Sequence, residues 1–203
     1  MNKQKTFLAN LVCTRISHDM VGNIGAIAAA IELATEDNHC VLDADARHIL
    51  TSATDTLKTR QRFFRIAFGL DSVSTSPQEL SRLCQDYLNT LGNRANKLDF
   101  ECNNISPELA KIICLSLMIG AEICIKGGHI KIHIGGGKLT ITTSSDYKLA
   151  SAKISAYEAL LNDQDNIENI SQFVQIIYLK QLLGEDVPIA MQHTEKQCQF
   201  VIG

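Results

Sequence analysis

The first third of the chain carries two long stretches of helical periodicity. In residues 1–35, large apolar side chains recur at steps of three and four and fall within a sector of roughly 80° on a helical wheel. These side chains are Ile16, Met20, Ile24, Ile27 and Ile31. A second stretch with this period runs from Leu42 to Ala67 and stops at Gly69, a residue type that commonly ends helices. Because only a short polar segment separates them, the two stretches predict an antiparallel helical hairpin.

A hairpin of two amphipathic helices cannot bury both of its apolar stripes by itself. A second copy of the hairpin would complete a four-helix bundle across a two-fold axis. A docked second domain is the alternative way to cover the exposed stripe. The pattern therefore predicts a homodimer, with the docked domain as the competing interpretation.

Beyond Gly69 the pattern changes to mixed helices and strands. Residues 71–77 are polar and form the best boundary, which divides the chain into residues 1–70 and 71–203. Helical patterns cover 77–91, 106–123, 150–161 and 170–183, and strand patterns cover 97–102, 129–134, 138–143, 188–191 and 197–202. This order predicts an α+β fold, in which the helical hairpin precedes a C-terminal α/β sandwich.

Composition narrows the class of protein. The chain has 203 residues, of which 45% are hydrophobic and 20% charged, as expected for a globular protein with a sizeable core. A net charge of -3 provides no general basic field, so we expect no nucleic-acid partner. The longest apolar stretch, residues 112–125, is too short to cross a bilayer and contains Glu122, so we expect no membrane partner. Seven cysteines without a CxxC pair or a secretory signal predict reduced thiols and a cytoplasmic location.

The strongest candidate for chemistry is His18. On the helical wheel it lies roughly 160° from the centre of the apolar stripe, so its side chain should face solvent. Arg15, Gly22, Gly25 and Ala26 lie on the same side of the helix. Each interior glycine costs a helix about 1 kcal/mol relative to alanine. A side-chain-free approach to the imidazole would explain that cost.

The neighbours of His18 suit phosphoryl transfer. A neutral imidazole is nucleophilic near pH 7, and Asp19 can accept a hydrogen bond or a proton from the other ring nitrogen. If the hairpin turn centres near Asn38, a basic group on the second helix lies level with His18 and could steady phosphoryl oxygens or bind an acidic partner. This group consists of Lys58, Arg62 and Arg65. An ordinary surface histidine and a solvated basic face are the alternative interpretations.

Three segments resemble a known family. Residues 13–27 resemble the H-box of sensor histidine kinases, and more closely that of the ChpT-type histidine phosphotransferases of bacterial phosphorelays. Residues 65–69, Arg-Ile-Ala-Phe-Gly, resemble the Arg-x-Ala-Phe-Gly ending of that family's second helix, and residues 174–179 resemble its last long helix. The resemblance spans essentially the whole chain in order. It implies a dimerisation and phosphotransfer hairpin followed by a domain shaped like a histidine-kinase ATP-binding domain.

The resemblance also implies a function. In that family a histidine receives a phosphoryl group from the receiver domain of a hybrid histidine kinase and passes it to response regulators, including cell-cycle regulators of the CtrA type. By position, His18 is the phosphoacceptor and Asp19 is its acidic neighbour. Receiver contacts are then expected on the surrounding face and on the second helix, at Arg15, Gly22, Asn23, Gly25, Ala26, Lys58, Arg62 and Arg65. Kinase H-boxes usually carry Thr or Asn at the position of Gly22, so kinase-style phosphatase chemistry is not expected.

The second half of the chain departs from an ATP-binding domain. Aligning residues 127–128 with the glycines that follow a kinase N-box places Leu115 and Ile119 where asparagines that bind Mg-ATP belong. The three glycines at 135–137 are better explained by a hairpin turn than by a phosphate loop. We therefore expect no nucleotide-binding residues and no cofactor, with any Mg²⁺ held by the partner receiver. An ATP-dependent sensor histidine kinase core and a non-catalytic adaptor for receivers are the alternative functions.

Two other groups of histidines have simpler explanations. His129 and His133 share one face of a strand, but a metal site would need a further converging ligand, so we expect surface histidines and no bound metal. His48 is a second candidate phosphoacceptor, although it lacks an approach face of small residues.

Overall fold

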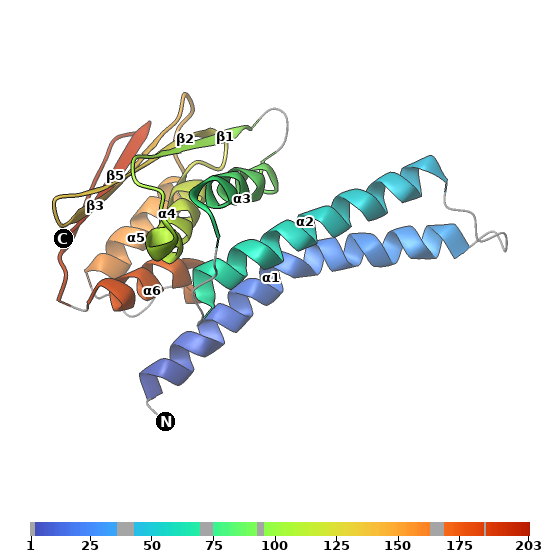
Figure 1. The fold of residues 1–203 in the computed structure, drawn as a ribbon, viewed down its shortest axis with the longest axis horizontal. Helices are drawn as coiled ribbons and strands as arrows, with labels where there is room; N and C mark the ends of the chain where they lie inside the picture. The colour runs from blue at the N-terminus through green and yellow to red at the C-terminus, as the bar shows by residue number, and fades with distance from the viewer. Residues whose placement is uncertain (1–2, 36–42, 70–74, 93–95, 163–168, 185) are drawn as a thin grey trace.

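The fold is known from a computed structural model that describes residues 3–35, 43–69, 75–92, 96–162, 169–184 and 186–203 (Figure 1). Two long helices come first, and a mixed α/β layer follows. The elements in chain order are α1 (Lys3–Thr35), α2 (Ala44–Phe68), α3 (Pro77–Asn89), β1 (Leu98–Cys102), the 3-10 turn η1 (Pro107–Leu109), α4 (Ala110–Ile123), β2 (Gly128–Gly135), β3 (Lys138–Ser144), α5 (Ser151–Leu161), the 3-10 turn η2 (Ile170–Phe173), α6 (Val174–Leu183), β4 (Ile189–His193) and β5 (Gln197–Ile202).

The two long helices form the antiparallel hairpin that the periodicity predicts, and it extends from the α/β layer as an arm (Figure 1). The helix α2 is capped at its start by Asp43, whose side chain accepts a hydrogen bond from the backbone N–H of Ala46 at 2.7 Å. It ends at Gly69, where a Cβ atom would collide with the carbonyl oxygen of Arg65. The turn between the helices lies outside the described residues.

The five strands form one sheet in the order β1-β2-β3-β5-β4. The β1–β2 pair is parallel, and the other three pairs are antiparallel. The β2–β3 hairpin closes at the pair Gly135–Lys138, and its two turn residues, Gly136 and Gly137, have φ values of 60° and 74°. Glycine adopts such values without strain, which explains the glycine run as a tight turn.

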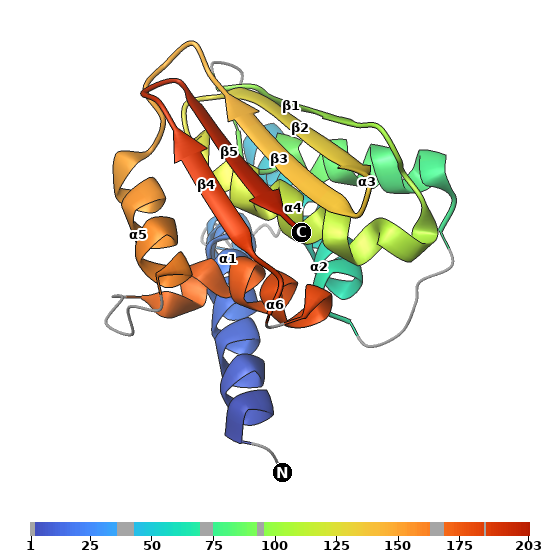
Figure 2. The same ribbon diagram turned by 90° about the vertical axis from the view of Figure 1, so that its left-hand side faces the viewer.

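One face of the sheet packs against helices and the other is open (Figure 2). Ile130, Ile132, Ile141 and Phe200 point to the covered face and are fully buried. The helix α4 lies against β2 and β3 and is buried along most of its length. Because strand side chains alternate between faces, the open face carries polar residues. The mixed α and β class predicted from the sequence is confirmed.

The hydrophobic core continues from the α/β layer into the last turns of α2. Phe63 and Phe64 are buried there, and the Phe63 ring stacks on the Tyr87 ring of α3 at a centroid distance of 3.7 Å. The predicted boundary falls between α2 and α3, and residues 70–74 lie outside the described residues. The division into residues 1–70 and 71–203 therefore stays a prediction.

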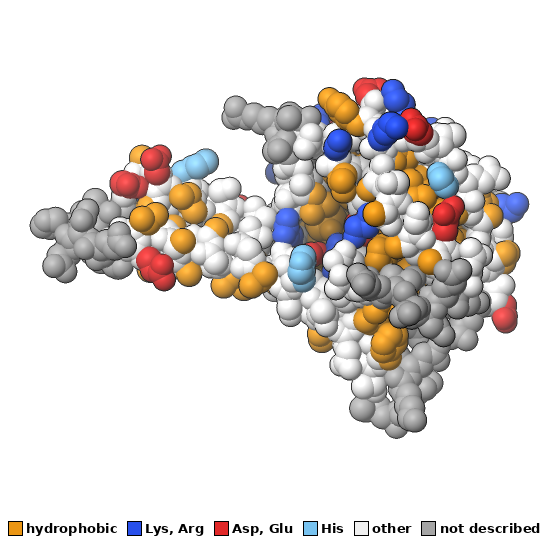
Figure 3. Space-filling view, turned by 180° about the vertical axis from the view of Figure 1, so that it is seen from behind, with side chains coloured by type: hydrophobic (Ala, Val, Ile, Leu, Met, Phe, Trp, Pro, Cys, Tyr) orange, Lys and Arg blue, Asp and Glu red, His pale blue; other side chains and the backbone are white. Residues whose placement is uncertain are grey.

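The α/β layer covers only part of the apolar stripe on α1. Leu11 is buried, and Ile16 and Met20 pack against the core. Farther along the arm, the exposed fractions of Ile24 and Ile31 are 56% and 51%. Hydrophobic side chains are visible along the arm in Figure 3. A docked domain thus accounts for the first half of the stripe and leaves the second half uncovered.

Among the helices within the described ranges, none combines the length and apolar character that crossing a membrane would require.

Candidate functional site

His18 lies on the surface of α1, as the helical wheel predicts. Its side chain is 73% exposed, and the neighbouring Asp19 side chain is only 16% exposed. The ring atom Nδ1 lies 3.3 Å from Asp19 Oδ1. A carboxylate that accepts a hydrogen bond from Nδ1–H favours the neutral tautomer whose lone pair is on Nε2. The nitrogen that faces away from Asp19 is therefore the one suited to act as a nucleophile.

Two arginines fix the position of Asp19. The Nε of Arg15 lies 2.8 Å from Asp19 Oδ2, and the Nη1 of Arg60 donates to the Asp19 carbonyl oxygen at 2.5 Å. Arg60 itself is held by Thr90, whose carbonyl oxygen accepts from Nη2 at 2.9 Å. The carboxylate beside His18 is thus anchored through both its side chain and its backbone.

Arg15 occupies a different place from the one expected. Its side chain is 10% exposed and turns inward to Glu122 of α4, instead of lying on the solvent face with His18. Burial alone would lower the pKa of Arg15, but the carboxylates of Glu122 and Asp19 outweigh it and raise that pKa. At this buried position, a charged Arg15 can influence a receiver only indirectly, by binding Asp19.

Arg60 was missed by the sequence reasoning. A hairpin turn centred near Asn38 places Lys58, and not Arg60, level with His18. Positions 58 and 60 are close along the helix, but a two-residue shift moves a side chain by roughly 200° around the helix axis. Position 60 then points toward α1, and position 58 does not.

The glycine face is open. A Cβ atom built on Gly22 or Gly25 meets no atom of the described residues within 4 Å. Both residues are exposed, whereas Asn23 and Ala26 are half-buried. Among the described residues, no packing contact requires a glycine at either position. Packing therefore does not explain why these helix-weakening residues lie on the face of an exposed histidine.

The basic residues of α2 that were expected near His18 are exposed. The Lys58 Nζ atom lies 3.5 Å from Asp55 on the same helix. Arg62 acts electrostatically on Glu79, whose pKa is lowered mainly by hydrogen bonds from Ser76. Arg65 is exposed near the end of the helix. In the described part of the chain, none of the three forms an ion pair with His18.

The positions that correspond to nucleotide-binding asparagines lie inside the core. Leu115 and Ile119 of α4 are both fully buried. Their side chains fill the space between α4 and its neighbours, so neither position presents a side chain to a ligand.

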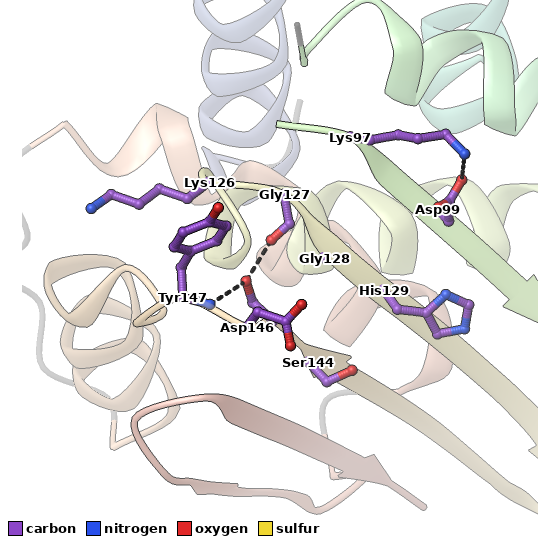
Figure 4. A pocket seen from close by; sticks show the side chains of 10 residues that line it. Lys97, Asp99, Lys126, Gly127, Gly128, His129, Ser144, Asp146 and Tyr147 are labelled. Atoms are coloured by element: carbon purple, nitrogen blue, oxygen red, sulfur yellow. Dashed lines mark hydrogen bonds and ion pairs between the residues drawn. The ribbon is translucent and has the colours of Figure 1, made fainter. Parts of the chain in front are cut away.

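A hollow of about 420 Å³ lies at the start of β2 and the end of β3 (Figure 4). The sequence patterns do not predict this hollow. The Lys97 Nζ atom lies 3.0 Å from Asp99 Oδ1, and the Ser145 hydroxyl donates to the Gly127 carbonyl oxygen at 2.6 Å. These polar residues of the hollow thus bind one another, and their presence there is explained by the structure without a ligand.

His129 and His133 share the open face of the sheet, as predicted. The Nε2 atom of His129 lies 3.8 Å from Glu101 Oε2. Within the described ranges there is no group of three or more His, Cys, Asp or Glu side chains that could hold a metal ion.

The fold and the site combine a long helical hairpin that carries an exposed histidine with a mixed α/β layer on which the hairpin is docked. No family model matches the chain. The protein phosphotransferase ChpT of Brucella abortus is 26% identical over 136 residues, which are 64% of this chain and 61% of that protein. The match thus spans less than two thirds of that relative.

Two solved structures can be superposed on nearly the whole chain. A bacterial phosphotransferase has a TM-score of 0.73 and 22% identity, with coverage of 100% of this chain and 98% of that one. The kinase domain of a blue-light-activated histidine kinase from Erythrobacter litoralis covers 99% of this chain and 93% of that one, with 13% identity and a TM-score of only 0.41. The likenesses to the two phosphotransferases confirm the resemblance to ChpT-type proteins.

Proposed function

We propose that this chain is a histidine phosphotransferase of a bacterial phosphorelay. The observation that carries the proposal is the exposed His18 imidazole, with the anchored Asp19 carboxylate at Nδ1 and an open glycine face beside it. The likeness in sequence to a protein named as a phosphotransferase supports the same activity. In this function His18 accepts a phosphoryl group from the aspartyl phosphate of one receiver domain and passes it to the aspartate of another.

The site residues have defined parts in the transfer. The Nε2 lone pair of His18 attacks the phosphorus in line with its bond to the receiver's aspartate oxygen. The N–P bond forms as that P–O bond breaks, and the aspartate carboxylate leaves with the bonding electron pair. The imidazole becomes cationic, and Asp19 stabilises this charge through the hydrogen bond at Nδ1. The reverse steps deliver the phosphoryl group to the next receiver.

The proposed partners are the receiver domains of a hybrid histidine kinase and of response regulators, with cell-cycle regulators of the CtrA type as the expected targets. The open face at Gly22 and Gly25 suits the close approach of a receiver to the imidazole. The exposed cations of α2 would bind its acidic surface, where the Mg²⁺ of the reaction belongs. A homodimer in the cytoplasm completes the proposal.

The two parts of the chain have different proposed roles. Residues 1–70 would dimerise and carry the phosphoryl group, and residues 71–203 would act as a scaffold without a nucleotide site. The burial of Leu115 and Ile119 supports this assignment, because neither side chain can reach a nucleotide.

The test is transfer of a labelled phosphoryl group. The chain is incubated with a ³²P-phosphorylated receiver domain and Mg²⁺, and the label is followed on gels after acid and base treatment. We expect an acid-labile, base-stable label that is absent from His18→Ala. The variant His48→Ala, which removes another exposed histidine of the hairpin, should accept the label normally. A wild-type chain that stays unlabelled beside a competent donor contradicts the proposal.

Two further arms separate the alternative functions. Incubation with labelled ATP alone should leave the chain unlabelled, and autophosphorylation would instead indicate a kinase. In a reconstituted relay, His18→Ala should abolish phosphorylation of the downstream regulator. If downstream phosphorylation persists in that variant, the chain is an adaptor and not a phosphotransferase.

A further inference from the structure

A buried polar network lies directly beneath the His18 face. Its centre is Arg15, and the side chains of Arg15 and Glu122 are only 10% and 11% exposed. Arg15 Nη1 donates to Glu122 Oε1 and, at 2.7 Å, to the carbonyl oxygen of Gln172. Arg15 Nε donates to Asp19 Oδ2 at 2.8 Å. One guanidinium therefore joins the carboxylate beside the reacting histidine to a second carboxylate in the α/β layer.

Glu122 is itself held by two other helices. Its Oε2 atom accepts from the hydroxyl of Tyr157 in α5 at 2.8 Å and from the amide of Gln175 in α6 at 2.7 Å. Burial, with a further contribution from Glu122, raises the pKa of Tyr157, so its hydroxyl remains a proton donor. The position of Glu122 is thus set by α4, α5 and α6 together.

The network has a geometric consequence for the site. A guanidinium is planar and rigid, so the direction of its Nε–H depends on where its Nη atoms are bound. Buried ion pairs contribute little net stability, because desolvation offsets their attraction. The arrangement is therefore better explained by the geometry it imposes on Asp19 than by stability.

We propose that Glu122 is a positioning residue for the chemistry of His18: acting through Arg15, it holds the Asp19 carboxylate against Nδ1. The effect on phosphoryl transfer rests on the proposed function. The effect on the orientation of His18 does not.

A double-mutant cycle tests whether Glu122 acts through Asp19. Initial rates of phosphoryl acceptance are compared for the wild-type chain, Glu122→Gln, Asp19→Asn and the double variant. We expect Glu122→Gln to slow the wild-type chain about tenfold and the Asp19→Asn chain less than about threefold, because the carboxylate to be positioned is already gone. Equal slowing in both backgrounds, or none in the wild-type background, overturns the proposal.

Stability is controlled separately, because Glu122→Gln leaves Arg15 with one carboxylate fewer. If that variant is unfolded by circular dichroism, the variant Arg15→Met/Glu122→Gln takes its place, since it removes the buried cation as well. We expect this variant to fold and to accept phosphate about tenfold more slowly, and a wild-type rate contradicts the proposal. The matched control is Ser116→Ala, a change on the same helix at a buried hydroxyl that has no hydrogen-bond partner in the described part of the chain.

A spectroscopic readout needs no phosphoryl donor. The ¹⁵N shifts of the neutral His18 ring report its tautomer, and Glu122→Gln should lower the Nδ1–H fraction while Ser116→Ala leaves it unchanged. If this fraction falls but the wild-type chain accepts no label, the proposed function fails and the positioning role stands. If label is accepted but neither rate nor tautomer responds to Glu122→Gln, the positioning role alone fails.

Discussion

At the scale of single residues, the site combines the solvent-exposed ring of His18 with a neighbouring side chain, Asp19, that is held in place. The His18 side chain is 73% exposed, whereas Asp19 is held by Arg15 and by Arg60. An exposed imidazole is accessible to a receiver, but its tautomer is set by the group that binds its other nitrogen. Anchoring that group removes a degree of freedom from the nucleophile without covering it.

Gly22 provides a residue-scale prediction that separates stability from function. A Cβ at this position meets no atom of the described residues within 4 Å, so Gly22→Ala should raise the free energy of unfolding by about 1 kcal/mol, measured by urea denaturation. The larger Gly22→Leu should slow phosphoryl acceptance from a receiver, because its side chain occupies the approach to His18.

The control for Gly22→Leu is Ala9→Leu, another exposed position on α1 that lies roughly 180° around the helix from His18. This variant should accept phosphate at the wild-type rate. If Gly22→Leu also keeps the wild-type rate, the glycine face does not serve the approach of a receiver.

At the scale of elements, the second helix of the hairpin is held firmly at its C-terminal end. The Gly69 carbonyl oxygen accepts from Lys111 Nζ at 2.6 Å, and the Phe68 ring stacks on Tyr178. A cation at the last carbonyl groups of a helix also complements its dipole. These contacts tie the base of the arm to α4 and α6, and the following helix begins with its own cap.

The start of α3 gives the prediction at this scale. Ser76 and Glu79 form a capping box, with hydrogen bonds of 3.2 Å from the Glu79 N–H to Ser76 Oγ and 2.9 Å from the Ser76 N–H to Glu79 Oε2. Ser76→Ala should lower the free energy of unfolding by about 1 kcal/mol at pH 7. The control Gln78→Ala, an exposed residue of the same turn, should leave it nearly unchanged.

The capping box also predicts how this loss depends on pH. Hydrogen bonds from Ser76 lower the pKa of Glu79 below its ordinary 4.5 in the folded state, so the ionised carboxylate stabilises the fold above that value. As pH falls through the lowered pKa, this stabilisation is lost. The difference between wild type and Ser76→Ala, followed by urea titrations, should narrow below about pH 4. A constant difference contradicts this assignment.

At the scale of the whole molecule, the α/β layer covers the base of the arm and leaves its far half exposed. Leu11 is buried and Met20 packs on the core, but Ile24 and Ile31 on the same stripe are each more than half exposed. A contiguous apolar stripe of this kind on the exposed side of a helix marks an interface. A second copy that packs arm against arm would form the proposed four-helix bundle.

The corresponding prediction concerns the oligomeric state. Ile24→Glu should convert a dimer into monomers, measured by light scattering after size-exclusion chromatography, because a charge in a packed helical interface must be desolvated. The matched control is Ile125→Glu, at a similarly exposed isoleucine that follows α4. A dimer that survives Ile24→Glu, or a wild-type monomer, contradicts the bundle.

Much of the fold could be predicted because its signals are local. The helical and strand ranges predicted from periodicity match α1, α2 and the elements beyond Pro77 to within a few residues. Ser76 and Gly69 mark helix ends through hydrogen bonds and close contacts within their own turns. The exposure of His18 also followed, because a helical wheel places side chains without any knowledge of the rest of the chain.

The sequence by itself determined which residues form helices and strands, which face of α1 carries the histidine and where glycines leave that face open. Only the tertiary structure decided what holds Asp19 in place. The contact between Arg15 and Glu122 joins residues 107 positions apart, and it exists because α1 docks on α4 in one orientation. A lone carboxylate in an apolar helix was the visible sign of such a contact, but local patterns carry no information about which distant cation a buried charge will meet.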